Sequence, residues 1–344
     1  SMAFIVTTFL PNSIFQQIVS AFDELIKEYE KIELIREKND WEQVVRLGKH
    51  YDTYILIIGE SARSDYHHAY GYPIENTPFM SSAQGILVSG LTSGGSASVA
   101  SLRLMLTLAE STWSARYNLN IIDLAKSAGF KTYWLSNSGY VGEHDTPITA
   151  IAKSSDELFF LKNGSYQSKN TSDFELLSKL TNILSKNSKT QSKLIVLHLY
   201  GSHPDPCQRI DDYHVINEIK ESYYSNINCY ISSIHTTDKF LEDVYKILLK
   251  GYENEGETFS MLYFSDHGLT HNELGSELKL TNSSLSKFHF SIPLFKISSA
   301  DFSRTACNSF KSGLNFTNGL ANWMGIGAKQ LDHQYTLFDC IDDP

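Results

Sequence analysis

Three side chains of metal-binding type follow two apolar stretches of this sequence. Glu60 comes shortly after the stretch 54–58, and the pair Asp266 and His267 comes shortly after the stretch 261–264. Carboxylate oxygens and an imidazole nitrogen are suitable zinc ligands, and three protein ligands leave one position open for chemistry. If the two stretches are neighbouring strands, the three side chains meet at one edge of a sheet. The alternative is that each set only caps the loop after its strand.

A loop of small residues offers a nucleophile. Residues 92–98 read Thr-Ser-Gly-Gly-Ser-Ala-Ser and lead into the apolar, helix-like segment 99–106. This order places the hydroxyl of Ser98 near a helix N-terminus, where backbone N–H groups and the helix dipole favour an anion. An attacking alkoxide and a phosphate would both be stabilised there. The alternative is a flexible Gly/Ser loop in which a serine serves as the N-cap.

Short apolar runs predict the strands that must position these groups. Each run is too short for a helix and lacks alternation, which is typical of strands buried on both faces. Helical patterns lie between them, so the sequence predicts an α/β fold with a mostly parallel central sheet and helices on both faces. The predicted strands are 54–58, 132–135, 194–199, 261–264 and 292–295, and the predicted helices are 121–127, 174–184 and 227–249.

The N-terminal part has a different pattern. After Pro11, apolar residues recur at helical spacing from Phe15 to Ile32, which predicts an amphipathic helix over about 13–37. We therefore divide the chain into a helical segment, 1–50, and one α/β domain, 51–344. No apolar run approaches the roughly 18 to 20 residues that span a bilayer.

Composition excludes one class of partner and leaves the redox state open. The formal net charge of −10 argues against nucleic-acid binding, which usually needs a basic surface. The four cysteines, Cys207, Cys229, Cys307 and Cys340, contain no CxxC pair, so neither a zinc ribbon nor a redox motif is present. We favour four free thiols, with one or two disulfides in an oxidising compartment as the alternative.

Taken together, separated motifs resemble those of the phosphoethanolamine transferases that modify bacterial lipid A and lipopolysaccharide core. That family belongs to the alkaline phosphatase and sulfatase superfamily. The resemblance spans 51–297 in the expected order. The motifs are GESARSD at 59–65, GY at 71–72, NTP at 76–78, TSGGSAS at 92–98, WLSN at 134–137, DTP at 145–147, His198, GSH at 201–203 and SDHG at 265–268.

The resemblance implies a role for each motif residue. In that family the residues that match Glu60, Asp266 and His267 bind one zinc ion together with a threonine, and the threonine attacks phosphorus. Ser98 stands at the threonine's position, and either hydroxyl can be ionised by zinc. The histidine that matches His203 lies in the substrate region, where it can stabilise phosphoryl oxygens or protonate a leaving group.

Two departures from the family pattern concern the substrate region. The lipid A branch often has a disulfide around the nucleophile and a histidine about a dozen residues after the Asp-His pair, whereas 278–281 reads Leu-Lys-Leu-Thr here. We consider His271 and His289 as substitutes for that histidine, and His198 as a further substrate-binding residue. The WLSN and DTP motifs bring the chain closer to the branch that acts on lipopolysaccharide core or glycans.

The resemblance implies zinc-dependent transfer of phosphoethanolamine from phosphatidylethanolamine to a lipopolysaccharide or glycan acceptor, through a covalent intermediate on Ser98. It also implies that transmembrane helices precede the chain, that segment 1–50 is a membrane-proximal connector, and that a monomeric catalytic domain faces the periplasm from the bacterial inner membrane. A helix packed on a complete soluble protein is the alternative for that segment.

Three other activities compete with this reading. A phosphoglycerol transferase or phosphodiesterase of the same superfamily is one alternative, and a catalytically inactive glycolipid-binding module is another. A sulfatase is disfavoured, because the Pro and Arg that direct formylglycine formation are replaced by Ala100 and Leu102.

Overall fold

The computed structural model describes residues 38–344 except 111–113, 139–145, 163–170, 187–189 and 211–214. The predicted helix over 13–37 lies outside the described residues, so the division of the chain at residue 50 stays a prediction. Among the described residues, we find no helix that combines the length and the apolar character needed to cross a membrane.

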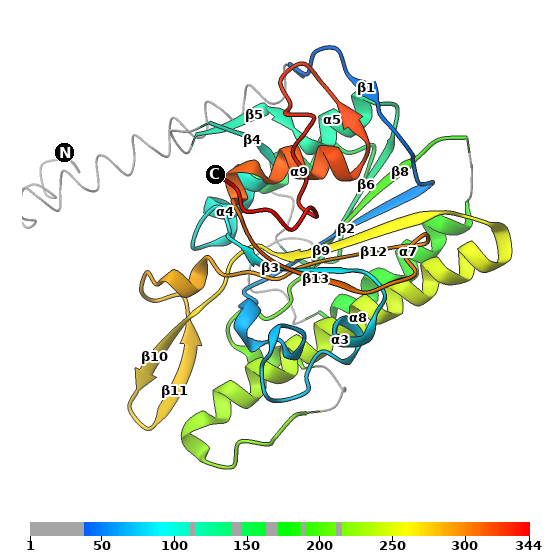
Figure 1. Cartoon of the computed structure of the whole chain (residues 1–344). Coiled ribbons are helices and arrows are strands. Elements are labelled where there is room, and N and C mark those ends of the chain that lie inside the picture. The colour runs from blue at the N-terminus through cyan, green and yellow to red at the C-terminus, as the bar shows by residue number, and fades with distance from the viewer. Residues whose placement is uncertain (1–37, 111–113, 139–145, 163–170, 187–189, 211–214) are drawn as a thin grey trace, which may run out of the picture.

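An eight-stranded sheet forms the centre of the described part (Figure 1). Strand β12 pairs antiparallel with both of its neighbours, while the other neighbouring strands pair parallel. The predicted α/β fold with a mostly parallel sheet is thus confirmed, and the predicted strand 292–295 belongs to the one strand that runs antiparallel to its neighbours. In spatial order the strands are β13 (Thr305–Lys311), β3 (Ile86–Leu91), β12 (Leu294–Ser298), β9 (Phe259–Ser265), β2 (Thr53–Gly59), β8 (Lys193–His198), β6 (Lys131–Ser136) and β7 (Glu157–Phe160).

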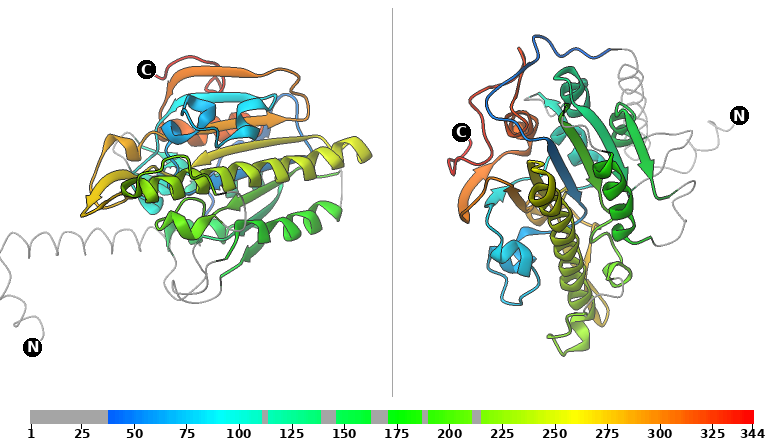
Figure 2. Two further views of the ribbon diagram at one scale, coloured as in Figure 1. Left: turned by 90° about the horizontal axis from the view of Figure 1, so that it is seen from below. Right: turned by 90° about the vertical axis from the view of Figure 1, so that its right-hand side faces the viewer.

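Helices cover both faces of this sheet (Figures 1 and 2). In β2, Tyr54, Leu56 and Ile58 belong to one hydrophobic core, and Ile55 and Ile57 belong to another. Successive side chains of a strand point to opposite faces, so a continuous apolar run serves two cores at once. One face carries α4 (Ser98–Met105), α5 (Ile121–Ser127), α6 (Pro147–Ala152) and α9 (Phe316–Trp323), and the other carries α3 (Pro78–Ser82), α7 (Leu176–Ser185) and α8 (Ser225–Glu255).

Local signals explain where the helices begin and end. Helix α5 has the predicted bounds because the side chain of Asn120 accepts a hydrogen bond from the N–H of Asp123 at its start. Helix α8 continues beyond the predicted residue 249 to Glu255 and is capped by Gly256, which has φ +70° in the left-handed region. Glycine adopts that conformation without the steric cost that a side chain brings.

Three small antiparallel sheets complete the described structure. Strands β10 (Thr270–Leu274) and β11 (Glu277–Thr281) form a hairpin that projects away from the central sheet (Figure 1). The other two pairs are β4 (Thr107–Ala109) with β5 (Ala115–Asn120), and β1 (Val45–Arg46) with β14 (Ile326–Gly327).

The four cysteines form two disulfides, Cys207–Cys229 and Cys307–Cys340. Our preference for free thiols is therefore wrong. The first disulfide joins the loop after β8 to α8, and the second joins β13 to the C-terminal segment. The partners are 22 and 33 residues apart in the sequence, so they meet only through the tertiary fold and no local motif identifies them.

Candidate metal and nucleophile site

Strands β2 and β9 place the three predicted metal ligands. They are parallel neighbours whose last residues, Gly59 and Ser265, pair directly, so Glu60 and Asp266 leave the sheet side by side. The N–H of Asp266 donates to the carbonyl of Gly59 at 3.1 Å, which continues the ladder by one more bond. Carboxyl ends of parallel strands are the usual place for functional groups in such sheets.

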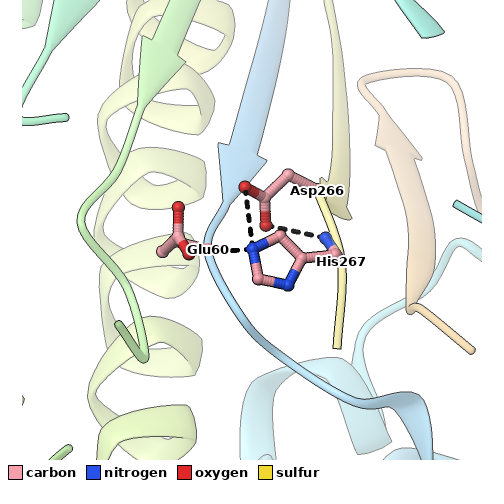
Figure 3. A group of neighbouring side chains, drawn as sticks. All are labelled: Glu60, Asp266 and His267. Atoms are coloured by element: carbon pink, nitrogen blue, oxygen red, sulfur yellow. Dashed lines mark hydrogen bonds and ion pairs between the residues drawn. The ribbon is translucent and has the colours of Figure 1, made fainter. Parts of the chain in front are cut away.

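Glu60, Asp266 and His267 form a compact, buried cluster (Figure 3). Each offers one ligand atom, and these atoms all lie within 4.8 Å of one another. His267 Nε2 is 3.3 Å from Glu60 Oε1 and 3.7 Å from Asp266 Oδ2. The three side chains are at most 3% exposed. Two carboxylates and one imidazole around a common centre are the type of donor set that zinc takes.

Hydrogen bonds outside the cluster orient the ligand atoms. His267 Nδ1 is 2.7 Å from the carbonyl of Gly268, which can only accept, so Nδ1 carries a proton and Nε2 is the nitrogen that faces the carboxylates and is left to bind a metal. Asp266 Oδ1 accepts from the N–H of Ser61 at 3.1 Å and of His267 at 2.7 Å. Asp266 Oδ2 is buried and has no hydrogen-bond partner among the described residues. An orphaned carboxylate oxygen of this kind fits a metal ion as its partner.

The pKa shifts of the three clustered side chains also fit a bound cation. Burial raises the pKa of Asp266 to about 7, and the charge of Glu60 acts in the same direction. Burial alone would raise the pKa of Glu60, but the hydrogen bond and charge of His267 hold it below its ordinary value. Burial opposes the charged form of His267, yet Asp266 and Glu60 raise its pKa to about 10. A divalent ion would replace the shared protons at this centre.

Ser98 completes the cluster as the first residue of α4. Its Oγ donates to Glu60 Oε2 at 2.9 Å and lies 3.5 Å from His267 Nε2. The small residues before it are required by packing, because a Cβ on Gly95 would lie 2.8 Å from the backbone of Ala100. The glycine loop thus folds back onto the first turn of the helix and delivers the hydroxyl to the metal ligands.

The turn that carries His203 packs directly on Glu60. The N–H of Ser202 donates to the carbonyl of Glu60 at 3.0 Å, and a Cβ on Gly201 would lie 2.9 Å from the Glu60 nitrogen. The half-buried His203 ring stacks on Tyr200 with 4.6 Å between centroids. Its Nδ1 lies 2.5 Å from the carbonyl of Pro204, so Nδ1–H donates and Nε2 is the nitrogen left for other partners.

The remaining predicted histidines differ in their surroundings. His271 hydrogen-bonds through Nε2 to the Tyr66 hydroxyl at 2.6 Å, so that nitrogen already has a protein partner. His198 is buried edge-on against Trp134, and burial lowers its pKa to about 4, so the ring is neutral. Among the described residues its Nε2 has no hydrogen-bond partner.

His289 lies next to the segment that carries the predicted metal ligands Asp266 and His267. It is fully buried, and its carbonyl accepts from the N–H of Gly268 at 2.8 Å, next to His267. Burial lowers the pKa of His289, and the charge of His267 adds to that effect. Within the described part of the chain its Nε2 has no hydrogen-bond partner. The sequence did not distinguish His289 from His271, whereas the structure joins His289 by a backbone hydrogen bond to the residue after His267 and pairs the ring of His271 with Tyr66.

Sequence reasoning missed Asp173, which holds the turn before His203. Asp173 Oδ1 accepts from the N–H of Tyr200 at 2.8 Å, and Oδ2 accepts from the N–H of Gly201 at 3.0 Å. The residue lies in a Ser-, Lys- and Asn-rich stretch with no strand-end signal, so the sequence alone gives no reason to select it.

The chain belongs to the Sulfatase family, whose model matches residues 52–326. It is 50% identical over 262 residues to a candidate phosphoethanolamine transferase of Haemophilus influenzae, covering 75% of this chain and 54% of the relative. It is 35% identical over 316 residues to the phosphoethanolamine transferase OpgE of Escherichia coli, covering 91% and 58%. The chain thus spans little more than half the length of these relatives. The resemblance seen in the motifs is confirmed.

Solved structures agree on the fold. The zinc complex of the C-terminal periplasmic domain of EcEptC from Escherichia coli has a TM-score of 0.69 at 18% identity, with 87% of this chain and 89% of that chain covered. The integral membrane protein EptA from Neisseria meningitidis has a TM-score of 0.66 at 17% identity, with 94% and 63% covered. The predicted fold of the alkaline phosphatase and sulfatase type is confirmed.

Proposed function

We propose that this chain is the catalytic domain of a zinc-dependent phosphoethanolamine transferase that uses Ser98 as a covalent nucleophile. The observation that carries the proposal is the hydrogen bond from Ser98 Oγ to Glu60 at 2.9 Å, inside the three-ligand cluster. A hydroxyl at a helix N-terminus and beside metal ligands is suited to attack phosphorus. The names of the relatives from Haemophilus influenzae and Escherichia coli support the same chemistry.

Glu60, Ser98, Asp266 and His267 would hold the zinc ion, which would supply Lewis-acid stabilisation of the serine alkoxide. In the first half-reaction, the Ser98 hydroxyl, which Glu60 Oε2 orients, loses its proton to solvent, and Ser98 Oγ bonds to the donor phosphorus. The bond from phosphorus to the diacylglycerol oxygen breaks. His203 gives that oxygen a proton, so diacylglycerol leaves as a neutral alcohol.

The second half-reaction reverses these proton movements. The acceptor hydroxyl gives its proton to His203 and attacks phosphorus, and the bond from phosphorus to Ser98 Oγ breaks. Ser98 then regains a proton from solvent. Splitting the transfer in this way replaces one difficult displacement by two easier ones. We assign His289 rather than His271 to the substrate side, because its buried Nε2 is unpartnered among the described residues and it lies against the segment of His267. His198 beside Trp134 remains a proposed second substrate contact.

The two disulfides support an oxidising compartment such as the periplasm. We propose that transmembrane helices anchor the whole protein in the bacterial inner membrane, with segment 1–50 as the connector. The acceptor we propose is a lipopolysaccharide sugar, lipid A or another glycan at that membrane, and the catalytic domain acts as a monomer.

Donor selectivity tests this function. The zinc-loaded protein should release diacylglycerol from phosphatidylethanolamine vesicles about tenfold faster or more than from phosphatidylglycerol vesicles, because the chain's charge of −10 disfavours an anionic lipid. Diacylglycerol release and labelled ethanolamine transfer are the measurements. Faster release from phosphatidylglycerol would favour the phosphoglycerol transferase alternative. No release from either lipid would favour the inactive binding module.

His203→Ala should lower turnover about a hundredfold or more while zinc content and melting temperature stay near wild type. The imidazole moves a proton in both half-reactions, but its ring is half-buried and does not belong to the metal cluster. Zinc content, melting temperature and turnover are measured on one preparation. A folded, zinc-loaded variant that keeps full turnover would remove His203 from the mechanism, and a loss of stability with retained turnover would make it a structural residue.

A further inference from the structure

One carboxylate, that of Asp173, holds two consecutive backbone N–H groups of the turn that ends at His203. The acceptor distances are 2.8 Å to Tyr200 N and 3.0 Å to Gly201 N, with one carboxylate oxygen for each. Hydrogen bonds to an ionised carboxylate are shorter and stronger than those between neutral groups. Two of them on adjacent residues fix both the position and the direction of the turn.

Asp173 is itself tied to the sheet through Asn137. Asn137 Nδ2 donates to Asp173 Oδ1 at 2.8 Å and to the carbonyl of Thr171 at 2.7 Å. The backbone N–H of Asn137 donates to the carbonyl of His198 at 2.8 Å, so Asn137 continues the ladder between β6 and β8. The carboxylate is therefore placed by the carboxyl ends of two sheet strands and not by a free loop.

Two residues of this turn contact the proposed site, Gly201 at Glu60 and Tyr200 at His203. Gly201 has φ +45°, and its Cα lies so close to Glu60 that an added Cβ would be 2.9 Å from the Glu60 nitrogen. Tyr200 stacks on His203 at 4.6 Å between ring centroids. A displacement of the Tyr200 and Gly201 backbone would therefore move the His203 ring. A shift of about 1 Å in a reacting group can cost a hundredfold in rate.

We propose that Asp173 is a positioning residue for proton transfer: it holds the turn so that His203 meets the phosphoryl group bonded to Ser98. This inference rests on the proposed role of His203. Asparagine has nearly the same shape but offers one acceptor oxygen and one NH₂ group. In Asp173→Asn, the NH₂ group would therefore face one of the two N–H donors and push the turn away.

The test is a double-mutant cycle of Asp173→Asn and His203→Ala, with turnover, zinc content and melting temperature measured for each variant. Asp173→Asn alone should lower kcat about tenfold or more and leave the donor KM within about threefold, with zinc retained. In the His203→Ala background, the same change should lower kcat by no more than about twofold, because the group that Asp173 positions is already absent.

Asp156→Ala is the control, because both hydrogen bonds to Asp156 end on one oxygen, which asparagine would keep. The Asp156 carboxylate also holds a strand, with Oδ2 accepting from the N–H of Thr132 at 2.8 Å and from its hydroxyl at 3.0 Å, but it does so at the start of β6. Losing that clamp should lower the melting temperature and leave kcat unchanged. Asp173→Glu is the second variant, since it keeps both acceptor oxygens, and it should recover part of the lost turnover and serve if Asp173→Asn does not fold.

The outcomes separate the two proposals. An equal loss from Asp173→Asn in both backgrounds, or no loss in wild type, would overturn the positioning role while leaving His203 in the mechanism. A parallel loss of turnover and melting temperature in both the Asp173 and Asp156 variants would also overturn it, in favour of a purely structural clamp. If His203→Ala keeps full turnover, the proposed proton transfer itself is wrong, and the inference falls with it.

Discussion

Replacing Ser98 by alanine should reduce turnover by about four orders of magnitude or more, because it removes the atom that bonds to phosphorus. The wild-type protein incubated with phosphatidylethanolamine alone should gain one phosphoethanolamine group on Ser98, detected by mass spectrometry of the peptide that contains residues 92–103. Ser98→Ala should show no such adduct. An adduct that persists in this variant would refute the covalent role of Ser98.

Ser98→Thr is the matched control for that experiment. It keeps the hydroxyl that donates to Glu60 and adds one methyl group at the half-buried first position of α4. We expect turnover within about tenfold of wild type, since a methyl group changes packing by only a small amount of free energy. If Ser98→Thr were as inactive as Ser98→Ala, the loop would have room for the serine side chain but not for the threonine methyl group. The resemblance to the threonine enzymes would then not extend to the nucleophile.

The apolar runs predicted the central strands well because each of them serves two cores. Strands β2, β8 and β9 are buried along their whole length, so their sequences lack alternation. Strands β3 and β13 were missed for the opposite reason. In β13 exposed and buried residues mostly alternate, and β3 contains Ser89 and Gly90, so neither forms a continuous apolar run. The same limitation hid the antiparallel direction of β12, because a buried strand has the same composition in either direction.

The metal cluster could be predicted because its residues follow strands directly. Glu60 and Asp266 are each the first residue after a parallel strand, and parallel strands place such residues at one edge. Asp173 belongs to a short 3₁₀ helix before α7, and its partners are backbone groups of Tyr200 and Gly201. Every residue except proline has a backbone N–H group, so the residue types at 200 and 201 give no sign of this contact. Only the tertiary structure reveals it. The disulfide pairing also depends on tertiary structure, because the partners are 22 and 33 residues apart in the sequence.

Glu60 contacts two other parts of the proposed site. Glu60 contacts Ser98 through its side chain and the His203 turn through its backbone carbonyl. A substitution at Glu60 would therefore remove a metal ligand and the hydrogen-bond partner of the nucleophile together, and its effect could not be divided between them. Asp266 makes a cleaner test of metal binding, because Oδ1 accepts both backbone hydrogen bonds while Oδ2 has no hydrogen-bond partner among the described residues.

Asp266→Asn should abolish zinc binding while leaving the fold intact. The asparagine Oδ1 can keep the hydrogen bonds from Ser61 and His267, whose nitrogens lie at 3.1 and 2.7 Å from Asp266 Oδ1. An NH₂ group then replaces Oδ2, the orphaned oxygen that faces the proposed metal, and it has no lone pair to give. Elemental analysis after equilibration with zinc should show near-stoichiometric metal in wild type and less than about a tenth of that in Asp266→Asn.

In the absence of metal, Asp266→Asn should not lower the melting temperature of the protein. Burial raises the pKa of Asp266 to about 7, above its ordinary value of 3.8, so the folded chain holds a proton that the unfolded chain releases. The contribution of this group to stability is therefore lost as the pH rises through about 7. Above that pH the metal-free Asp266→Asn variant should melt at or above the temperature of metal-free wild type, because it buries one charge fewer. Zinc should then raise the wild-type melting temperature and leave the variant unchanged. A variant that binds zinc fully, or that melts well below metal-free wild type, would show that Asp266 supports the fold and not the metal.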